Sequence, residues 1–414
     1  MVPLKNAYLA AWAKPHEQSW EIDENLAELG ELVKDAGLAV AGTIIQRRSK
    51  PEPATLIGKG KVGEIKDMLS EGDVVVFDDE LLPAQQANLV EMLDAPVLDR
   101  TQVILDIFAR RARTKEGKIQ VELAQLNYTL PRLTGQGAAM SRLGGGIGTR
   151  GPGETKLEID RRRIRERIGD LRRELQDVVR FRDVQRQNRQ RSELPMAALV
   201  GYTNAGKSTL LTALTGQGAY VQDQLFATLD PLIRRWDLNS QVAIYLGDTV
   251  GFIRKLPHTL VAAFRATLED VLQADLLLHV IDASHPQAER QKEAVETVLH
   301  EIGAKQEIIC VYNKIDQLEE PLNLHPPHQA VSALTGQGLG DLTQAVYQFF
   351  EHLYALREYF FPFDSMAEAT YVRDHGEVIA EEFTPDGLVL KARVNQTTAG
   401  RLAAYETKTF ITRP

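Results

Sequence analysis

The sequence predicts an α/β protein made of several parts that follow one another along the chain. Two observations predict this class. Short apolar runs such as Ala197–Val200 and Val242–Leu246 end in polar or glycine-rich loops and alternate with helical patterns, which is typical of a mostly parallel sheet. A one-sided apolar seam between Leu157 and Val178 predicts, in addition, a long helix outside any sheet.

The loop after Ala197–Val200 has the sequence Gly201-Tyr-Thr-Asn-Ala-Gly-Lys207-Ser208. This spacing is that of a P-loop, whose backbone N–H groups surround phosphate groups. We expect Lys207 to reach the β- and γ-phosphates and the Ser208 hydroxyl to bind Mg²⁺. The predicted phosphate-binding residues are Gly201, Tyr202, Thr203, Asn204, Ala205, Gly206, Lys207, Ser208 and Thr209.

Two later motifs predict that the bound base is guanine. The apolar run Ile308–Tyr312 is followed by Asn-Lys-Ile-Asp, and a carboxylate at the fourth position can accept from both N1–H and N2–H of guanine. A lone motif of this kind is more often a helix cap or a turn, but its order after the P-loop predicts GTP and GDP as ligands. Ser-Ala-Leu further on is expected to offer backbone N–H groups to the guanine O6. The predicted guanine-binding residues are Asn313, Lys314, Asp316, Ser332, Ala333 and Leu334.

Two segments between these motifs have the composition of nucleotide-sensing switches. In the first we expect Thr228 to join Ser208 around Mg²⁺ when GTP is bound, the alternative being a turn Thr ahead of an Asp-Pro pair. In the second, Asp248 is placed to hold Mg²⁺ through water, and the N–H of Gly251 to sense the γ-phosphate. Switch I comprises Phe226, Ala227, Thr228, Leu229 and Asp230, and switch II comprises Asp248, Thr249, Val250, Gly251 and Phe252.

Phe252 stands where many GTPases have a Gln that orients the attacking water. A Phe cannot do this, so we expect slow intrinsic hydrolysis, on the order of 10⁻⁴ to 10⁻² s⁻¹, that a partner accelerates. Asn204 is a candidate ligand for a monovalent cation such as K⁺, which would supply missing positive charge. An Asn that only caps the backbone is an equally weighted interpretation.

The long helix is expected from about Lys156 to Arg191, which makes an arm about 50 Å long at 1.5 Å per residue. Its expected antiparallel partner is a helix around Ile119 to Leu130, ended by Pro131. Between Arg142 and Arg191 there are 15 Lys/Arg and 8 Asp/Glu, although the whole chain has a net charge of −9. A basic arm with a glycine-rich tip is suited to structured RNA, while a merely soluble charged coiled coil is the alternative. The candidate RNA contacts are Arg142, Gly144, Gly145, Gly146, Thr149, Arg150, Arg161, Arg162 and Arg163.

The flanking regions predict two smaller units. Near the N-terminus we expect strands at Ala39–Gln46 and Val74–Phe77 and helices at Ile22–Leu32 and Val62–Leu69. Near the C-terminus we expect a hairpin of strands at Tyr371–Ala380 and Leu388–Val394 across Thr384–Gly387, then a helix near Thr398–Tyr405. The predicted domains are an N-terminal α/β domain (1–100), a helical coiled-coil arm (101–193), a P-loop GTPase domain with a mostly parallel sheet (194–356), and a small C-terminal α+β domain (357–414).

Composition adds limits to these assignments. The single cysteine, Cys310, excludes an internal disulfide and fits a reducing compartment. There is no apolar run near 18 residues and no charged segment followed by an apolar one at the N-terminus, so we expect neither a membrane span nor a secretory signal. We expect a cytoplasmic protein that is a monomer.

The string Gly148-Thr-Arg-Gly-Pro-Gly-Glu-Thr-Lys-Leu-Glu158, with Asp160-Arg-Arg-Arg-Ile164 after it, resembles the HflX family of translational GTPases. The P-loop and both switch motifs resemble that family too, including the apolar residue at Phe252. The resemblance covers residues 5 to 355 and implies a GTPase that binds the large ribosomal subunit and its rRNA, is stimulated by it, and separates stalled ribosomes. Because some members bind adenine nucleotides through the N-terminal domain, ATP is a candidate ligand there.

Two other functions stay open on the sequence. One is a GTPase of ribosome assembly or RNA modification. The other is an RNA-remodelling NTPase that works through residues 1–190.

Overall fold

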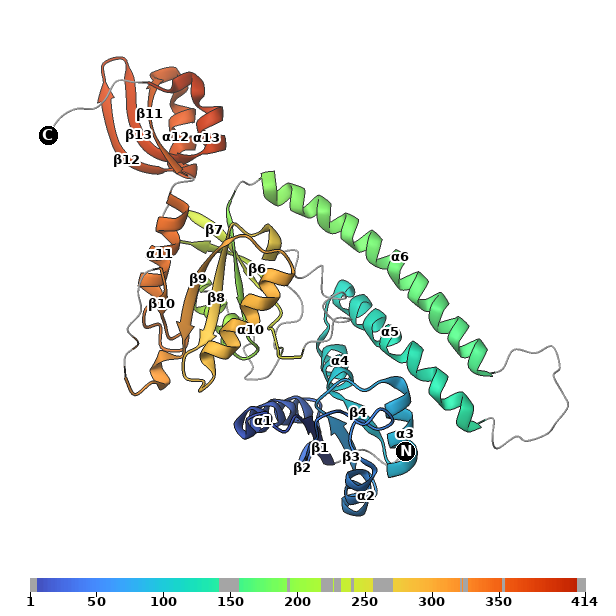
Figure 1. The fold of residues 1–414 in the computed structure, drawn as a ribbon. Helices are drawn as coiled ribbons and strands as arrows, with labels where there is room; N and C mark the ends of the chain where they lie inside the picture. The colour runs from blue at the N-terminus through green and yellow to red at the C-terminus, as the bar shows by residue number, and fades with distance from the viewer. Residues whose placement is uncertain are drawn as a thin grey trace. The chain divides into compact units, whose positions relative to one another are not determined.

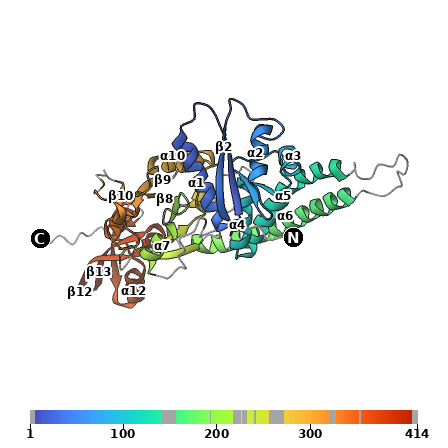
Figure 2. The ribbon, with the colours of Figure 1, turned by 90° about the horizontal axis from the view of Figure 1, so that it is seen from below.

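The computed structural model describes residues 6–140, 156–191, 194–216, 226, 232–239, 242–255, 271–320, 322, 327–351 and 354–407. The chain divides into two compact units, whose helices and strands are labelled in Figure 1 and seen from below in Figure 2. The first unit contains residues 1–181, 222–230 and 253–267, and the second contains residues 182–221, 231–252 and 268–414.

The N-terminal part of the first unit is a parallel sheet with the strand order β2-β1-β3-β4. The predicted strands and helices at Ala39–Gln46, Val74–Phe77, Ile22–Leu32 and Val62–Leu69 are all present within a few residues of the expected positions. The boundaries are β1 Asn6–Ala13, α1 Ser19–Asp35, β2 Ala39–Arg47, α2 Lys59–Met68, β3 Val74–Phe77, α3 Pro83–Leu93, β4 Val97–Asp99 and α4 Arg100–Arg111.

The arm consists of α5 (Lys115–Met140) and α6 (Lys156–Arg191), which lie side by side in both views (Figures 1 and 2). Arg167 of α6 donates to both carboxylate oxygens of Glu122 on α5, at 2.7 Å and 2.9 Å. On the seam, Ile168 and Leu171 are buried, as their spacing predicts. The long helix and its pairing partner are therefore present where we expected them.

The expectation that Pro131 ends the partner helix is wrong, because α5 continues to Met140 with Pro131 inside it. A proline costs a helix one backbone hydrogen bond. At this position the next residue supplies other bonds: the Arg132 guanidinium donates to the carbonyl oxygens of Tyr128 (3.0 Å) and Leu81 (2.7 Å). It also lies over the Tyr128 ring at 3.4 Å, so one tertiary bond, to Leu81, and two contacts within the helix stabilise a turn that local propensity disfavours.

The centre of the second unit is a sheet with the strand order β10-β9-β8-β5-β7-β6, in which only β6 runs antiparallel to its neighbour. Its apolar core joins the sheet to α7 and α11 through residues such as Leu199, Leu210 and Val346. The boundaries are β5 Met196–Gly201, α7 Lys207–Thr215, β6 Leu232–Asp237, β7 Ala243–Asp248, β8 Leu276–Asp282, α10 Ala288–Glu301, β9 Glu307–Asn313, η1 Ile315–Gln317, β10 Gln329–Ala330 and α11 Leu339–Glu351.

The C-terminal part of the second unit is an antiparallel sheet, β11-β13-β12, packed against short helices. The hairpin between β12 and β13 closes at Thr384 and Gly387, as predicted. The strand expected at Tyr371–Ala380 is wrong, since its first half is helical and the strand begins only at Glu377. The boundaries are β11 Tyr354–Pro362, η2 Phe363–Ser365, α12 Met366–His375, β12 Glu377–Thr384, β13 Gly387–Asn395, α13 Gln396–Arg401 and η3 Ala403–Tyr405.

No helix in the described ranges is both long enough and apolar enough to cross a membrane.

Candidate functional site

The P-loop leaves the carboxyl end of β5 and enters α7 at Lys207. Its bends need glycine: a Cβ on Gly201 would lie 2.2 Å from the carbonyl oxygen of Val280, and one on Gly206 would lie 2.2 Å from Nδ2 of Asn313. Gly206 also has a positive φ of 92°. The backbone therefore turns tightly at the end of the sheet, where parallel-sheet proteins bind their ligands.

Lys207 is buried and its ammonium group donates to the carbonyl oxygens of Gly201 (3.0 Å) and Tyr202 (2.7 Å). Burial lowers the pKa of Lys207 to about 8. The side chain thus lies within the loop that the sequence assigns to phosphate, and an anion there would stabilise its charged form.

The hydroxyl group of Ser208 donates a hydrogen bond to Oδ2 of Asp248 at 2.6 Å, so two oxygen atoms that can bind a metal ion lie side by side. Asp248 is buried at the end of β7, the strand beside β5. A hydroxyl and a carboxylate are hard oxygen ligands of the kind that Mg²⁺ prefers, so these residues fit the ion that the P-loop motif implies.

Switch II is bonded directly to the P-loop. The N–H of Thr203 donates to the carbonyl oxygen of Phe252 (2.7 Å), and the N–H of Phe252 donates to the carbonyl oxygen of Gly201 (3.1 Å). A Cβ on Gly251 would lie 2.9 Å from Cα of Thr203 and 3.0 Å from Nζ of Lys207. Only glycine fits this close approach, and the Phe252 side chain beside it is buried.

Asn313, at the end of β9, connects two loops that are far apart in the sequence. Its Nδ2 donates to the carbonyl oxygen of Ala205 in the P-loop (2.9 Å), and its Oδ1 accepts from the N–H of Ala333 (2.9 Å). The N–H of Ser332 donates to the carbonyl oxygen of Gln337. The N–H groups of Ser332 and Ala333, two of the three expected to face guanine O6, therefore donate to acceptors of the protein itself. The third residue, Leu334, lies on an exposed turn.

Lys314 adopts a left-handed backbone conformation (φ 64°), and its ammonium group pairs with the Asp282 carboxylate at 2.6 Å. Asp316 follows in η1 with its side chain exposed. Asp282 is a residue that our sequence interpretation missed. The available signal was an Asp at the end of the apolar run Leu276–Ile281, the same arrangement that identified Asp248.

Switch I is described only at Phe226, which belongs to the first compact unit. Its ring is buried and packs edge-on against Phe108, with the centroids 4.6 Å apart. The other switch I residues, Thr228 among them, lie outside the described residues. So do the arm-tip candidates Arg142, Gly144, Gly145, Gly146, Thr149 and Arg150. On the arm itself, Arg162 and Arg163 are exposed, whereas Arg161 is half-buried.

The fold and this cluster of loops define a P-loop GTPase. Three family models match the chain: the GTP-binding GTPase N-terminal region over residues 23–109, the GTP-binding GTPase middle region over 111–189, and the 50S ribosome-binding GTPase over 196–314.

Similar proteins indicate which family of P-loop GTPases the chain belongs to. The chain is 49% identical to the GTPase HflX of Caldanaerobacter subterraneus subsp. tengcongensis over 377 residues, covering 90% of this chain and 88% of that protein. It is 48% identical to the GTPase HflX of Escherichia coli K12 over 333 residues, covering 78% of each. The chain belongs to the HflX family of GTPases. A solved structure that it resembles is SsGBP with GDP (28% identity, TM-score 0.47, covering 84% of this chain and 99% of that one).

Proposed function

We propose that this GTPase binds the large ribosomal subunit through its arm and, with GTP bound, separates stalled ribosomes into subunits. The exposed arginines of α6 are the observation that carries the proposal. Arg163 and Arg165 are exposed on either side of the seam through which Ile168 and Leu171 pack. Arginines exposed along a stiff helix suit the phosphates of structured RNA. The 50S ribosome-binding description of the matching GTPase model supports the same partner.

In the nucleotide site, we assign Lys207 and the P-loop N–H groups to the phosphates and Asp316 to the guanine edge. Ser208 and Thr228 would hold Mg²⁺ directly, and Asp248 would hold it through water. When bound, the ion neutralises phosphate charge. Gly251 would donate its N–H to the γ-phosphate, so the bonds that join Phe252 to the P-loop respond to the presence of that phosphate.

The proposal includes activation by the ribosome. The buried Phe252 side chain has no group that can orient water, and thus the isolated protein hydrolyses GTP slowly. Contacts with the large subunit supply the missing orientation or charge. K⁺ beside Asn204 is a second source of charge, and the exposed position of Asn204 at the bend of the P-loop, with a φ of 61°, is compatible with it.

Docking of the arm into large-subunit RNA would be incompatible with the joined ribosome, so the subunits part. Hydrolysis then releases the protein. The arm tip, with Arg150 and the glycines Gly144–Gly146, is proposed to make the deepest contacts.

GTP turnover measured alone, with small subunits, with large subunits and with joined ribosomes, in K⁺ and in Na⁺, tests the proposal. We expect large subunits to stimulate turnover by orders of magnitude. Subunit separation is then followed by sedimentation with a non-hydrolysable GTP analogue. Stimulation by assembly intermediates or tRNA, with none by large subunits, would overturn the ribosome proposal in favour of assembly or RNA modification.

A matched pair of variants isolates the arm. Arg163→Glu with Arg165→Glu reverses two charges on α6, and Lys50→Glu with Lys305→Glu makes the same charge change at exposed sites elsewhere. We expect only the arm variant to lose large-subunit binding, by at least about tenfold, because phosphate contacts dominate such affinities. Both variants should bind GDP normally, and equal loss of ribosome binding in both would remove the arm from the interface.

A further inference from the structure

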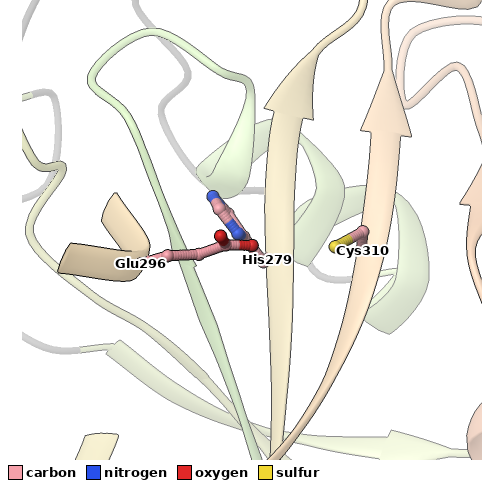
Figure 3. Close-up of side chains that lie close together, drawn as sticks. All are labelled: His279, Glu296 and Cys310. Atoms are coloured by element: carbon pink, nitrogen blue, oxygen red, sulfur yellow. The ribbon is translucent and has the colours of Figure 1, made fainter. Parts of the chain in front are cut away.

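A second group of chemically active side chains lies in the sheet of the GTPase domain, next to the strand that leads into the P-loop, where Val200 is the register partner of His279. His279 of β8 and Cys310 of β9 are register partners in adjacent parallel strands, so their side chains project from the same face. Glu296 comes from α10, the helix over that face (Figure 3). On β8 the alternate residues Leu276, Leu278 and Val280 point into the core on the other face.

The donor atoms of these three side chains, one nitrogen, one sulfur and one oxygen, all lie within 4.8 Å of one another. In a tetrahedral Zn²⁺ site, with metal–ligand bonds of 2.0 to 2.3 Å, neighbouring donor atoms are about 3.5 Å apart. Rotations about side-chain bonds close a difference of about 1 Å without moving the strands. A thiolate, an imidazole and a carboxylate are also the three ligand types that zinc uses in proteins.

The imidazole of His279 supplies an independent observation. The side chain is 1% exposed, and its Nδ1 atom has no hydrogen-bond partner among the described residues. A buried polar nitrogen without a partner is costly, and in native proteins it usually signals an unrecorded ligand or a functional role. Burial lowers the pKa of His279 to about 3, which keeps the ring in the neutral form that coordinates metals.

Apolar packing alone would explain Cys310, which lies beside Ile281 and Tyr312 in a small core cluster. It does not explain His279, because an apolar residue would fill the same space at no cost in unmet hydrogen bonds.

The alternative to a metal ion is that the ammonium group of Lys292 is the charged neighbour of Cys310 and His279. Its charge lowers the pKa of the Cys310 thiol, against the larger effect of burial, and that of His279. Lys292 is half-buried and also pairs with the exposed Glu289, one turn earlier on α10, at 3.5 Å.

We propose that His279, Cys310 and Glu296 bind a Zn²⁺ ion, with water in the fourth position. Three residues beyond His279 and Cys310, β8 and β9 end at Asp282 and Asn313, which are themselves register partners. The ion would therefore tie α10 to β8 and to β9, the strand that leads into the guanine motif at Asn313. It would act as a structural clip, separate from Mg²⁺ at Ser208.

The test uses the full-length protein, stripped with a chelator and then loaded with GDP and Mg²⁺ so that the nucleotide site is filled. Co²⁺ replaces Zn²⁺ as a spectroscopic probe. Because Cys310 is the only cysteine in the chain, a thiolate-to-cobalt charge-transfer band can arise from no other residue. We expect this band at one equivalent of Co²⁺, with the visible bands of tetrahedral cobalt, and its loss when Zn²⁺ is added.

Cys310→Ser should abolish the band, and His279→Gln and Glu296→Gln should weaken Zn²⁺ binding at least about tenfold. Glu289→Gln is the matched control, with the same charge change on the same helix, and should bind Zn²⁺ as the unmodified protein does. GDP affinity confirms that each variant folds. The cobalt band of the unmodified protein tests the proposal even if a variant does not fold. Absence of the charge-transfer band, or Zn²⁺ affinity that Glu289→Gln lowers as much as Glu296→Gln, would overturn the proposal.

Discussion

The carbonyl oxygen of Phe252 accepts a hydrogen bond from the N–H of Thr203 at 2.7 Å, which ties switch II to the P-loop by their backbones. The Phe252 side chain is 4% exposed. At this position the side chain is buried while the main chain connects the two loops, and the phenyl ring has no polar group that could orient water.

Phe252→Gln should consequently fail to restore fast hydrolysis. We expect the turnover number of the isolated protein to change by less than about threefold, far below the effect of a correctly placed catalytic group. The free energy of unfolding should fall by about 1–3 kcal/mol, because an amide would be buried without partners. Phe252→Leu is the control, with a cost of about 1.5 kcal/mol or less. A tenfold gain in turnover with Gln would show that the side chain can reach the nucleotide.

Gly251→Ala should separate the response to GTP from the binding of GDP. An added methyl group would lie 2.9 Å from Cα of Thr203 and 3.0 Å from Nζ of Lys207. Since Gly251 is the proposed γ-phosphate sensor, we expect GTP affinity to fall at least about tenfold, with a smaller effect on GDP. Gly340→Ala is the control, because a Cβ there has no atom within 4 Å. Equal losses of GTP and GDP affinity would argue against a γ-phosphate role.

Asn313→Ala removes the bonds to both Ala205 and Ala333. Each loss leaves a buried partner unsatisfied, so the free energy of unfolding should fall by about 1–3 kcal/mol and GDP affinity should fall with it.

Asp316→Asn should change nucleotide binding without changing stability. Its side chain is exposed, so stability should change by less than about 0.5 kcal/mol. GTP should bind more weakly and xanthosine triphosphate should now bind, which a nucleotide competition assay measures.

Lys207 predicts proton uptake on nucleotide binding. Its pKa is lowered to about 8 by burial, whereas phosphate oxygens beside the ammonium group would raise it. The charged form is favoured in the complex, and affinity should be lost as the pH rises through 8. Calorimetry of GDP binding in buffers of different ionisation enthalpy should show uptake of about 0.8 proton at pH 8.5 and about 0.2 at pH 7.5. Uptake that does not rise between these pH values would show that the pKa of Lys207 is not depressed.

Much of the loop arrangement at the candidate site was predictable from the sequence alone. The P-loop, switch II and the guanine motif each follow an apolar run, and parallel strands bring such loops to one edge of a sheet. The helix over Lys156–Arg191 was predictable for a similar reason, because its apolar seam repeats with a helical period. These are features in which each local pattern agrees with the tertiary arrangement.

Other features depended on contacts that no local pattern records. The helix α5 passes through Pro131, and Arg132 in its next position donates to the carbonyl oxygen of Leu81, which lies 51 residues earlier in the chain. The segment Met366–His375 is helical, although its apolar residues were consistent with a strand, because Ala369 and Val372 fill the face of an antiparallel sheet.

By itself, the sequence determined that the P-loop, Asp248 and the Asn313 motif each follow a strand and come in this order, because motif spacing reflects the covalent chain. Only the tertiary structure decided that Phe252 is a packing residue, that Asn313 joins two loops, and that His279, Cys310 and Glu296 share one face. Such relationships depend on strand register and helix placement, which are set by packing between segments that the chain keeps far apart.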